Sequence, residues 1–316
     1  MNTEQTKTIT LVLPVFNEED NVTPFVETVI PILQTLDMNW EMVFVDDGST
    51  DTTTEVVQQH HQKHHNIKLL CLSRNFGKEA ALTAGLEWAQ GDAVVPMDVD
   101  LQDPPELLIP FVEKWQQGFD VVLGQRSERK HDTKTKKWSA GLFYKIFNKI
   151  SSFEIEPNVG DYRLMDRKVV TETLKLRERN RFMKGLFSWV GFKTALVTYE
   201  RPARQIGHSK FNFWKLWNFA LDGITGFSTI PLRIWTYIGV ALSMMSFLYL
   251  IGTGISVGLM GNEAGENSTL LNVILFLGGV QLMSLGIMGE YLGRLYMEVK
   301  QRPIYVVSNT IGLDPR

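Results

Sequence analysis

The chain has 316 residues, of which 44% are hydrophobic and 21% charged, and its formal net charge is −3. That balance excludes collagen, a coiled coil and wholesale disorder, and the slight acidity argues against a general nucleic-acid binder. The single cysteine, Cys71, excludes a disulfide framework and a cysteine-built metal centre.

The first 126 residues alternate between strand-like and helix-like patterns. Apolar, β-branched runs predict strands over 8–16, 41–49, 67–73, 93–100 and 120–126, and the runs between them predict helices over 21–36, 52–60, 78–90 and 106–118. This alternation predicts an α/β fold, with a doubly wound, mostly parallel sheet covered by helices on both faces. In such sheets, ligands bind beyond the carboxyl ends of the strands.

Acidic residues lie at the carboxyl ends of two of these predicted strands. The usual glycine-rich nucleotide motifs are absent, since no GxGxxG follows the first strand and the chain has no GxxxxGK[ST]. Instead, Asp46 and Asp47 break the second strand near its end, and Asp98 and Asp100 end the fourth. Two close carboxylates repel each other unless a cation lies between them, and hard oxygen ligands favour Mg²⁺ or Mn²⁺. The pair at 98 and 100 therefore predicts a divalent-metal site that would hold a diphosphate.

Two long apolar stretches lie near the C-terminus. No charged residue occurs from 234 to 262 or from 267 to 289, and each stretch exceeds the ~20 residues that cross a bilayer. We expect transmembrane helices at about 234–258 and 269–290. Lys and Arg flank the pair on the outside, so the positive-inside rule predicts that both chain ends are cytoplasmic. Two buried helices of a soluble domain are the alternative.

An aromatic segment, FNFWKLWNF (211–219), precedes these stretches. It predicts an interfacial helix lying on the membrane, or alternatively a soluble amphipathic helix. The predicted layout is a catalytic domain over 1–200, an interfacial linker over 201–230, two transmembrane helices within 231–295 and a cytoplasmic tail over 296–316.

Five ordered motifs give the chain a family resemblance. They are PVFNEED (14–20), VFVDDGSTD (43–51), SRNFGKEAALTAGL (73–86), MDVDLQDPPE (97–106) and GDYRLMDR (160–167). Together with the C-terminal hairpin they resemble family 2 glycosyltransferases that act on polyprenyl phosphates. Within that family the chain is most similar to the bactoprenol glucosyltransferases of O-antigen glucosylation. Dolichyl-phosphate mannose synthase and the aminoarabinose transferase of lipid A modification are more distant relatives.

The resemblance implies a GT-A-like nucleotide-sugar domain and roles for the matching residues. Contacts to the nucleotide sugar are implied for Pro14, Asn17, Glu18, Asp46, Asp47, Asp98 and Gln102. Binding of Mg²⁺ or Mn²⁺ is implied for Asp98 and Asp100, and catalytic roles for Asp100, Asp161 and Arg126.

The expected acceptor is a lipid phosphate, which is largely ionised at neutral pH because its second pKa is about 6. It is already a nucleophile, but it must approach an anionic sugar diphosphate, so basic side chains must screen the repulsion. Candidate ligands of the lipid phosphate are Arg126, Arg129, Arg163, Arg201, Arg204, Ser209 and Lys210. For the lysines of the basic segment 125–137, a solvated loop or a patch binding anionic lipid is the alternative.

The resulting functional prediction is an inverting transferase at the bacterial inner membrane, with its catalytic domain in the cytoplasm. It would move a hexose, glucose from UDP-glucose by resemblance, onto undecaprenyl phosphate for O-antigen or other envelope glycan modification. UDP-aminoarabinose derivatives and GDP-mannose are alternative donors. A non-catalytic lipid-phosphate-binding protein and a soluble nucleotidyltransferase-like enzyme are alternative functions. Self-association, as a tetramer by resemblance, is also expected.

Overall fold

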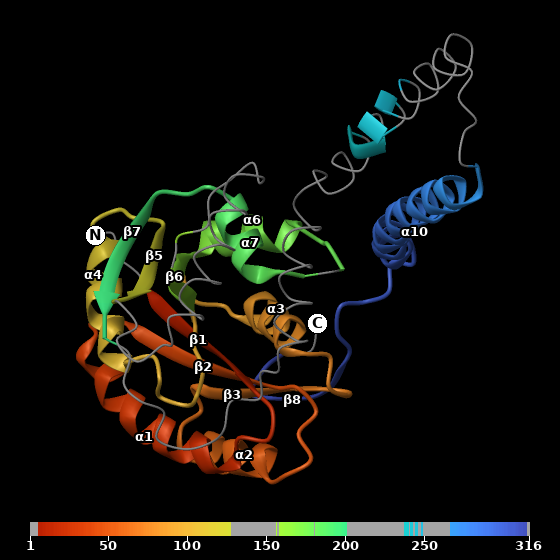
Figure 1. Cartoon of the computed structure of the whole chain (residues 1–316). Helices are drawn as coiled ribbons and strands as arrows, with labels where there is room; N and C mark the ends of the chain where they lie inside the picture. The colour runs from red at the N-terminus through yellow and green to blue at the C-terminus, as the bar shows by residue number, and fades with distance from the viewer. Residues whose placement is uncertain are drawn as a thin grey trace. The chain divides into compact units, whose positions relative to one another are not determined.

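The computed structural model describes residues 6–127, 158–179, 181–200 and 266–314, together with Glu156 and isolated positions between 237 and 248. Within these residues the strands form one eight-stranded sheet of order β7-β5-β6-β4-β1-β2-β3-β8 (Figure 1). The strands are β1 (Thr8–Val15), β2 (Asn39–Asp46), β3 (Ile67–Leu72), β4 (Ala93–Pro96), β5 (Val121–Arg126), β6 (Val159–Asp166), β7 (Thr194–Tyr199) and β8 (Val307–Ile311). The helices are α1 (Glu19–Thr35), α2 (Thr53–Lys63), α3 (Lys78–Trp88), η1 (Pro105–Leu107), α4 (Leu108–Gln116), α6 (Arg167–Lys175), α7 (Met183–Trp189) and α10 (Glu266–Val299).

The sheet is mixed rather than wholly parallel. Strands β1, β2, β3 and β4 pair in parallel at its centre, as the alternation predicted, and β5 pairs in parallel with β7. Strand β6 lies antiparallel between β4 and β5, and β8 lies antiparallel to β3 at one edge. The parallel strands therefore end at the edge of the sheet where β6 begins.

Continuous apolar runs in the central strands bury both faces of the sheet. Ile9, Leu11 and Leu13 of β1 point to one face, where they join the core formed with α1 and α4. Val43 and Val45 of β2 point to the other face and pack against α3. Figure 1 shows α1, α2 and α4 on one side of the sheet and α3 on the other. Successive side chains of a strand alternate between faces, so apolar residues at nearly every position favour a sheet covered on both sides.

Two boundaries differ from the sequence expectation. The fourth strand ends at Pro96, so Asp98 and Asp100 lie in the loop beyond it rather than within the strand. The C-terminal segment, which we expected to be a cytoplasmic tail over 296–316, contributes β8 to the sheet. Consistent with this pairing, residues 302–316 belong to the same compact unit as residues 1–220.

The second compact unit spans residues 221–301. Its described helix, α10, contains the predicted second membrane span at 269–290 and carries exposed apolar side chains, among them Leu282, Leu285 and Leu292. In the part of the chain that the structure describes, no helix meets the combined length and hydropathy of a membrane span. The interfacial linker at 201–230 lies outside the described residues, and the predicted span at 234–258 is described only at isolated positions. The hairpin therefore stays a prediction.

Candidate active site at the carboxyl edge of the sheet

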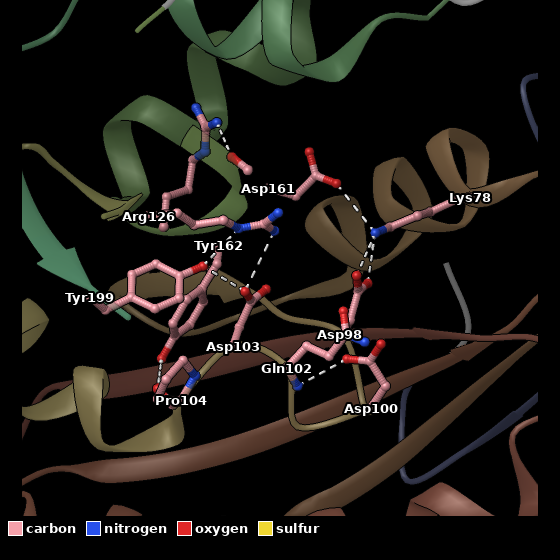
Figure 2. Close-up of polar contacts among 12 residues, drawn as sticks. Lys78, Asp98, Asp100, Gln102, Asp103, Pro104, Arg126, Asp161, Tyr162 and Tyr199 are labelled. Carbon is pink, nitrogen blue, oxygen red and sulfur yellow. Dashed lines mark hydrogen bonds and ion pairs between the residues drawn. The ribbon is translucent and has the colours of Figure 1, made fainter. Parts of the chain in front are cut away.

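The reversed direction of β6 brings distant acidic and basic residues together. Asp98 lies two residues beyond the end of β4, and Arg126 is the last residue of β5. Asp161 lies near the start of β6, which runs antiparallel to both of these strands. The start of β6 and the ends of β4 and β5 therefore meet at one edge, as Figure 2 shows.

A lysine joins two of the acidic groups. Nζ of Lys78 lies 2.7 Å from Oδ1 of Asp98 and 3.3 Å from Oδ2 of Asp161 (Figure 2). Although burial alone would lower the pKa of Lys78, the two carboxylates raise it above its usual range. The lysine is therefore protonated, and its ammonium group neutralises part of the charge of this acidic pair.

The loop before Lys78 is held by an acidic residue from a neighbouring strand. Asp47, directly after β2, accepts hydrogen bonds from the backbone N–H groups of Phe76 at 2.7 Å and Gly77 at 2.9 Å. Gly77 has a φ of 96°, a conformation that glycine adopts without strain, and it precedes the first residue of α3. Asp47 thus fixes the backbone directly before Lys78, and with it the position of Lys78 at the start of α3.

Asp161 is ionised at neutral pH. Burial raises the pKa of this carboxyl, but Lys78, Lys184 and Arg163 oppose burial and bring the pKa down to about 2. The same environment acts on its basic neighbour Lys184, whose pKa burial lowers. A carboxylate with such a low pKa holds cations well but accepts a proton poorly.

Arg163 of β6 is buried beneath this cluster. Its side chain is 4% exposed, its Nη2 donates to the carbonyl oxygen of Gly160 at 2.7 Å, and its guanidinium carbon lies 4.4 Å from the ring centre of Phe187. Burial lowers the pKa of Arg163 to about 10. These contacts anchor β6 to α7, and the expected contact of Arg163 with a lipid phosphate stays a prediction.

A second buried carboxyl couples α3 to α7. Oε2 of Glu79 accepts a hydrogen bond from the backbone N–H of Met183 at 2.9 Å. Burial and the nearby charge of Asp161 raise the pKa of Glu79 to about 7. The contact holds the first turn of α7, and with it Lys184, beside the helix that carries Lys78.

The predicted metal ligands lie in a tight loop. Oδ1 of Asp100 accepts a hydrogen bond from the backbone N–H of Gln102 at 3.1 Å, and Leu101 between them has a φ of 54°. Among the described residues, no group of three or more His, Cys, Asp or Glu side chains forms a ready-made metal cluster.

The predicted nucleotide residues also frame this edge. Asp46 is 3% exposed and Asp47 is 4% exposed, and burial raises the pKa of each carboxyl. Between their strand and the next lies Gly48, where a side chain would meet the backbone carbonyl carbon of Arg74 at 2.6 Å. Both aspartates therefore brace loops at this edge, and their contact with a nucleotide stays a prediction.

The residues at the end of β1 join the same loops. Oδ1 of Asn17 accepts a hydrogen bond from the backbone N–H of Thr50 at 2.8 Å, and the backbone N–H of Glu18 donates to Oγ1 of Thr53 at 2.9 Å. Pro14 lies within β1 opposite Val45 in the parallel register. These contacts tie the exits of β1 and β2 together, as a shared binding edge requires.

Several site residues escaped the sequence analysis. None of five residues that contact or electrostatically influence Asp98, Arg126 or Asp161 was assigned a role, although the first three lie within the five motifs: Lys78, Glu79, Asp103, Lys184 and Tyr199. Conversely, the predicted lipid-phosphate ligands Arg129, Arg201, Arg204, Ser209 and Lys210 lie outside the described residues.

Two family models match different parts of the chain. Residues 10–174 match the model of Glycosyl transferase family 2, and residues 230–295 match that of the GtrB C-terminal hairpin. A mannosyl-3-phosphoglycerate synthase from Rubrobacter xylanophilus is a solved structure with 17% identity and a TM-score of 0.49, covering 68% of this chain and 71% of its own.

Full-length relatives are much closer in sequence. An uncharacterized glycosyltransferase of Synechocystis sp. is 47% identical over 306 residues, which cover 97% of this chain and 96% of the relative. The SfII prophage-derived bactoprenol glucosyl transferase of Shigella flexneri is 51% identical over 307 residues, which cover 97% and 99%. The chain therefore belongs to glycosyl transferase family 2 and is a glycosyltransferase.

Proposed function

We propose that the protein transfers a hexose from a UDP-sugar, with UDP-glucose as the first candidate, onto undecaprenyl phosphate with inversion at the anomeric carbon. The observation that carries the proposal is the meeting of Asp98, Asp161 and Lys78 with the basic end of β5 at one edge of the sheet. The name of the Shigella flexneri relative, a bactoprenol glucosyl transferase, supports both the acceptor and the sugar.

The residues at this edge fit a divalent cation. Lys78 already places one positive charge between Asp98 and Asp161, so the carboxylates are arranged to share a cation. Asp98 and Asp100 would hold Mg²⁺ or Mn²⁺ through oxygen atoms, the ligands that both ions prefer. A metal ion bound there supplies positive charge that stabilises the departing nucleoside diphosphate.

The chain's own residues would then manage the charge of the acceptor. Because the acceptor phosphate is largely ionised at neutral pH, it attacks without a general base, and the low pKa of Asp161 is consistent with a role other than proton abstraction. Arg126 would screen the repulsion between the acceptor phosphate and the donor diphosphate.

The location of the reaction follows from the acceptor. Undecaprenyl phosphate is embedded in a bilayer, so we propose that the segment from 230 to 295 anchors the enzyme in the bacterial inner membrane with its catalytic unit in the cytoplasm. The match to the GtrB C-terminal hairpin and the uncharged stretches of the sequence support this placement.

The test is transfer by the full-length protein in membranes. Labelled UDP-glucose, a UDP-aminoarabinose derivative and GDP-mannose are each supplied with undecaprenyl phosphate, and label in the lipid is measured with the anomeric configuration of the product. We expect glucosyl transfer with inversion, lost in excess EDTA and in Asp100→Asn. Asp37→Asn, an exposed position after α1, is the matched control and should retain activity. Retention of configuration, or full turnover in EDTA, would contradict the mechanism, and label from another donor alone would reassign the sugar.

A further inference from the structure

The guanidinium of Arg126 is held by two side chains from other parts of the chain. Its Nε donates to the hydroxyl of Tyr199 at 3.2 Å, and its Nη2 lies 3.6 Å from Oδ1 of Asp103. The Tyr199 hydroxyl in turn donates to the same Asp103 oxygen at 2.6 Å. Figure 2 shows the three side chains converging, from the end of β5, the end of β7 and the loop before η1.

The hydroxyl of Tyr199 uses both of its hydrogen-bonding roles in this cluster. It accepts a hydrogen bond from Arg126 and donates one to Asp103, so its proton points toward Asp103. Asp103 is 5% exposed and Tyr199 is 7% exposed. Burial and the charge of Asp103 raise the pKa of Tyr199 to about 12, so the phenol stays neutral throughout the physiological range.

Packing fixes the ring that carries this hydroxyl. The ring of Tyr199 meets that of Tyr162 edge to face, with centroids 6.4 Å apart, and Tyr162 packs on Phe111 at 5.0 Å. The hydroxyl of Tyr162 donates to the carbonyl oxygen of Pro104 at 3.0 Å, which also steadies the loop next to Asp103. The two partners of Arg126 are therefore held by the core of the catalytic unit.

The far end of the guanidinium lies over a glycine. A Cβ on Gly160 would approach Nη2 of Arg126 to 3.1 Å, a distance tighter than ordinary van der Waals contact. The next residue is Asp161, whose charge also acts on Arg126. The absence of a side chain at Gly160 thus lets the guanidinium lie against the start of β6.

We propose that Tyr199 and Asp103 are positioning residues that hold Arg126 ready for the acceptor phosphate. A guanidinium already fixed in its binding geometry loses less conformational freedom when an anion arrives, so the fixed arrangement strengthens acceptor binding. The inference rests on the proposed function, because it assigns the anion that Arg126 meets.

The test compares two buried tyrosines that each lose one hydroxyl. Tyr199→Phe keeps the ring but removes the contacts to Arg126 and Asp103, whereas Tyr162→Phe removes only the bond to Pro104. Because the hydrogen bonds lost in Tyr199→Phe are bonds to charged groups, we expect the KM for undecaprenyl phosphate to rise about tenfold. The KM for the UDP-sugar and the melting temperature of the full-length protein should change no more than in Tyr162→Phe.

A double-mutant cycle with Arg126→Met separates positioning from general damage. If Tyr199 acts through Arg126, Tyr199→Phe has little further effect on the acceptor KM once the arginine is gone. Equal acceptor KM values for wild type and Tyr199→Phe, equal shifts in both tyrosine variants, or an undiminished effect in the Arg126→Met background would each overturn the inference while leaving the proposed function intact. A wild-type protein that transfers nothing to undecaprenyl phosphate would overturn both.

Discussion

Replacing Lys78 with methionine tests whether the ammonium group of Lys78 competes with a metal ion for the carboxylate of Asp98. The ammonium of Lys78 lies 2.7 Å from Asp98 and 3.3 Å from Asp161, where it neutralises charge that a divalent cation would otherwise neutralise. Methionine keeps the length of the side chain but brings no charge. We therefore expect Lys78→Met to bind Mn²⁺ more tightly than wild type when no donor is present.

The size of the effect follows from the exposure of the ion pair. A hydrogen bond between charged groups contributes about 1.5–3 kcal/mol when it is well buried. Here the side chains of Lys78 and Asp98 are 46% and 39% exposed, so solvent screening favours the lower end of that range. A difference of about 1.4 kcal/mol corresponds to a tenfold lower dissociation constant for Mn²⁺.

The assay is a Mn²⁺ titration of the full-length protein in detergent, followed by the electron paramagnetic resonance of free Mn²⁺. Lys175→Met is the matched control, because Lys175 pairs with Glu172 on the exposed side of α6 and should leave the dissociation constant unchanged. An unchanged or weaker Mn²⁺ affinity in Lys78→Met would refute the idea that the ammonium and the metal compete for the carboxylate of Asp98.

Three further predictions concern the catalytic unit away from the metal. In Gly85→Ala a new Cβ would lie 2.2 Å from Cγ1 of Val12, so overpacking of about 1–3 kcal/mol should outweigh a helix-propensity gain of about 1 kcal/mol and lower the urea midpoint of unfolding; an unchanged midpoint would contradict this. Burial favours a higher pKa for Glu41, but hydrogen bonds, the first from Lys68, lower it. Wild type should therefore exceed Glu41→Gln in free energy of unfolding by the full amount above about pH 4.5, and this difference should shrink as the pH falls through the lowered pKa. A difference that stays constant from pH 7 to 3 would refute this expectation. Because burial raises the pKa of Cys71 to about 11, its alkylation by iodoacetamide at pH 8 should be roughly 100-fold slower in the native protein than in urea, and equal rates would contradict the assignment.

The sequence was most informative where structure depends on near neighbours. The alternation of apolar strands with helices predicted the elements from β1 to β5, because residues within one element determine its period. Asp98 and Asp100 could be singled out because their position after a strand and their chemistry are both local properties. The same alternation predicted that these strands pair mostly in parallel, as β1, β2, β3 and β4 do.

The contacts that assemble the site depend on strand order, which the local pattern leaves open. Lys78 and Asp161 are 83 residues apart, and Tyr199 and Asp103 are 96 apart, yet each pair meets in the fold. The motif at 160–167 was recognised as a motif, but its residues become a strand between β4 and β5 only in the folded sheet. Neither Lys184 nor Tyr199 was predicted to reach this edge, because both do so through the folding of segments distant in the sequence from Asp161 and Asp103.

The antiparallel strand explains why donor and acceptor chemistry can share one edge. Had β6 run parallel to its neighbours, its first residues would lie at the opposite edge from Asp98 and Arg126. Its reversal instead places Asp161 between the acidic loop after β4 and the basic end of β5, where it contacts Lys78 on one side and is stabilised by Lys184 and Arg163. A carboxylate held at a pKa of about 2 among these cations keeps its charge at any physiological pH. The negative charge of Asp161 therefore stays unchanged while the donor diphosphate and the acceptor phosphate bind at this edge.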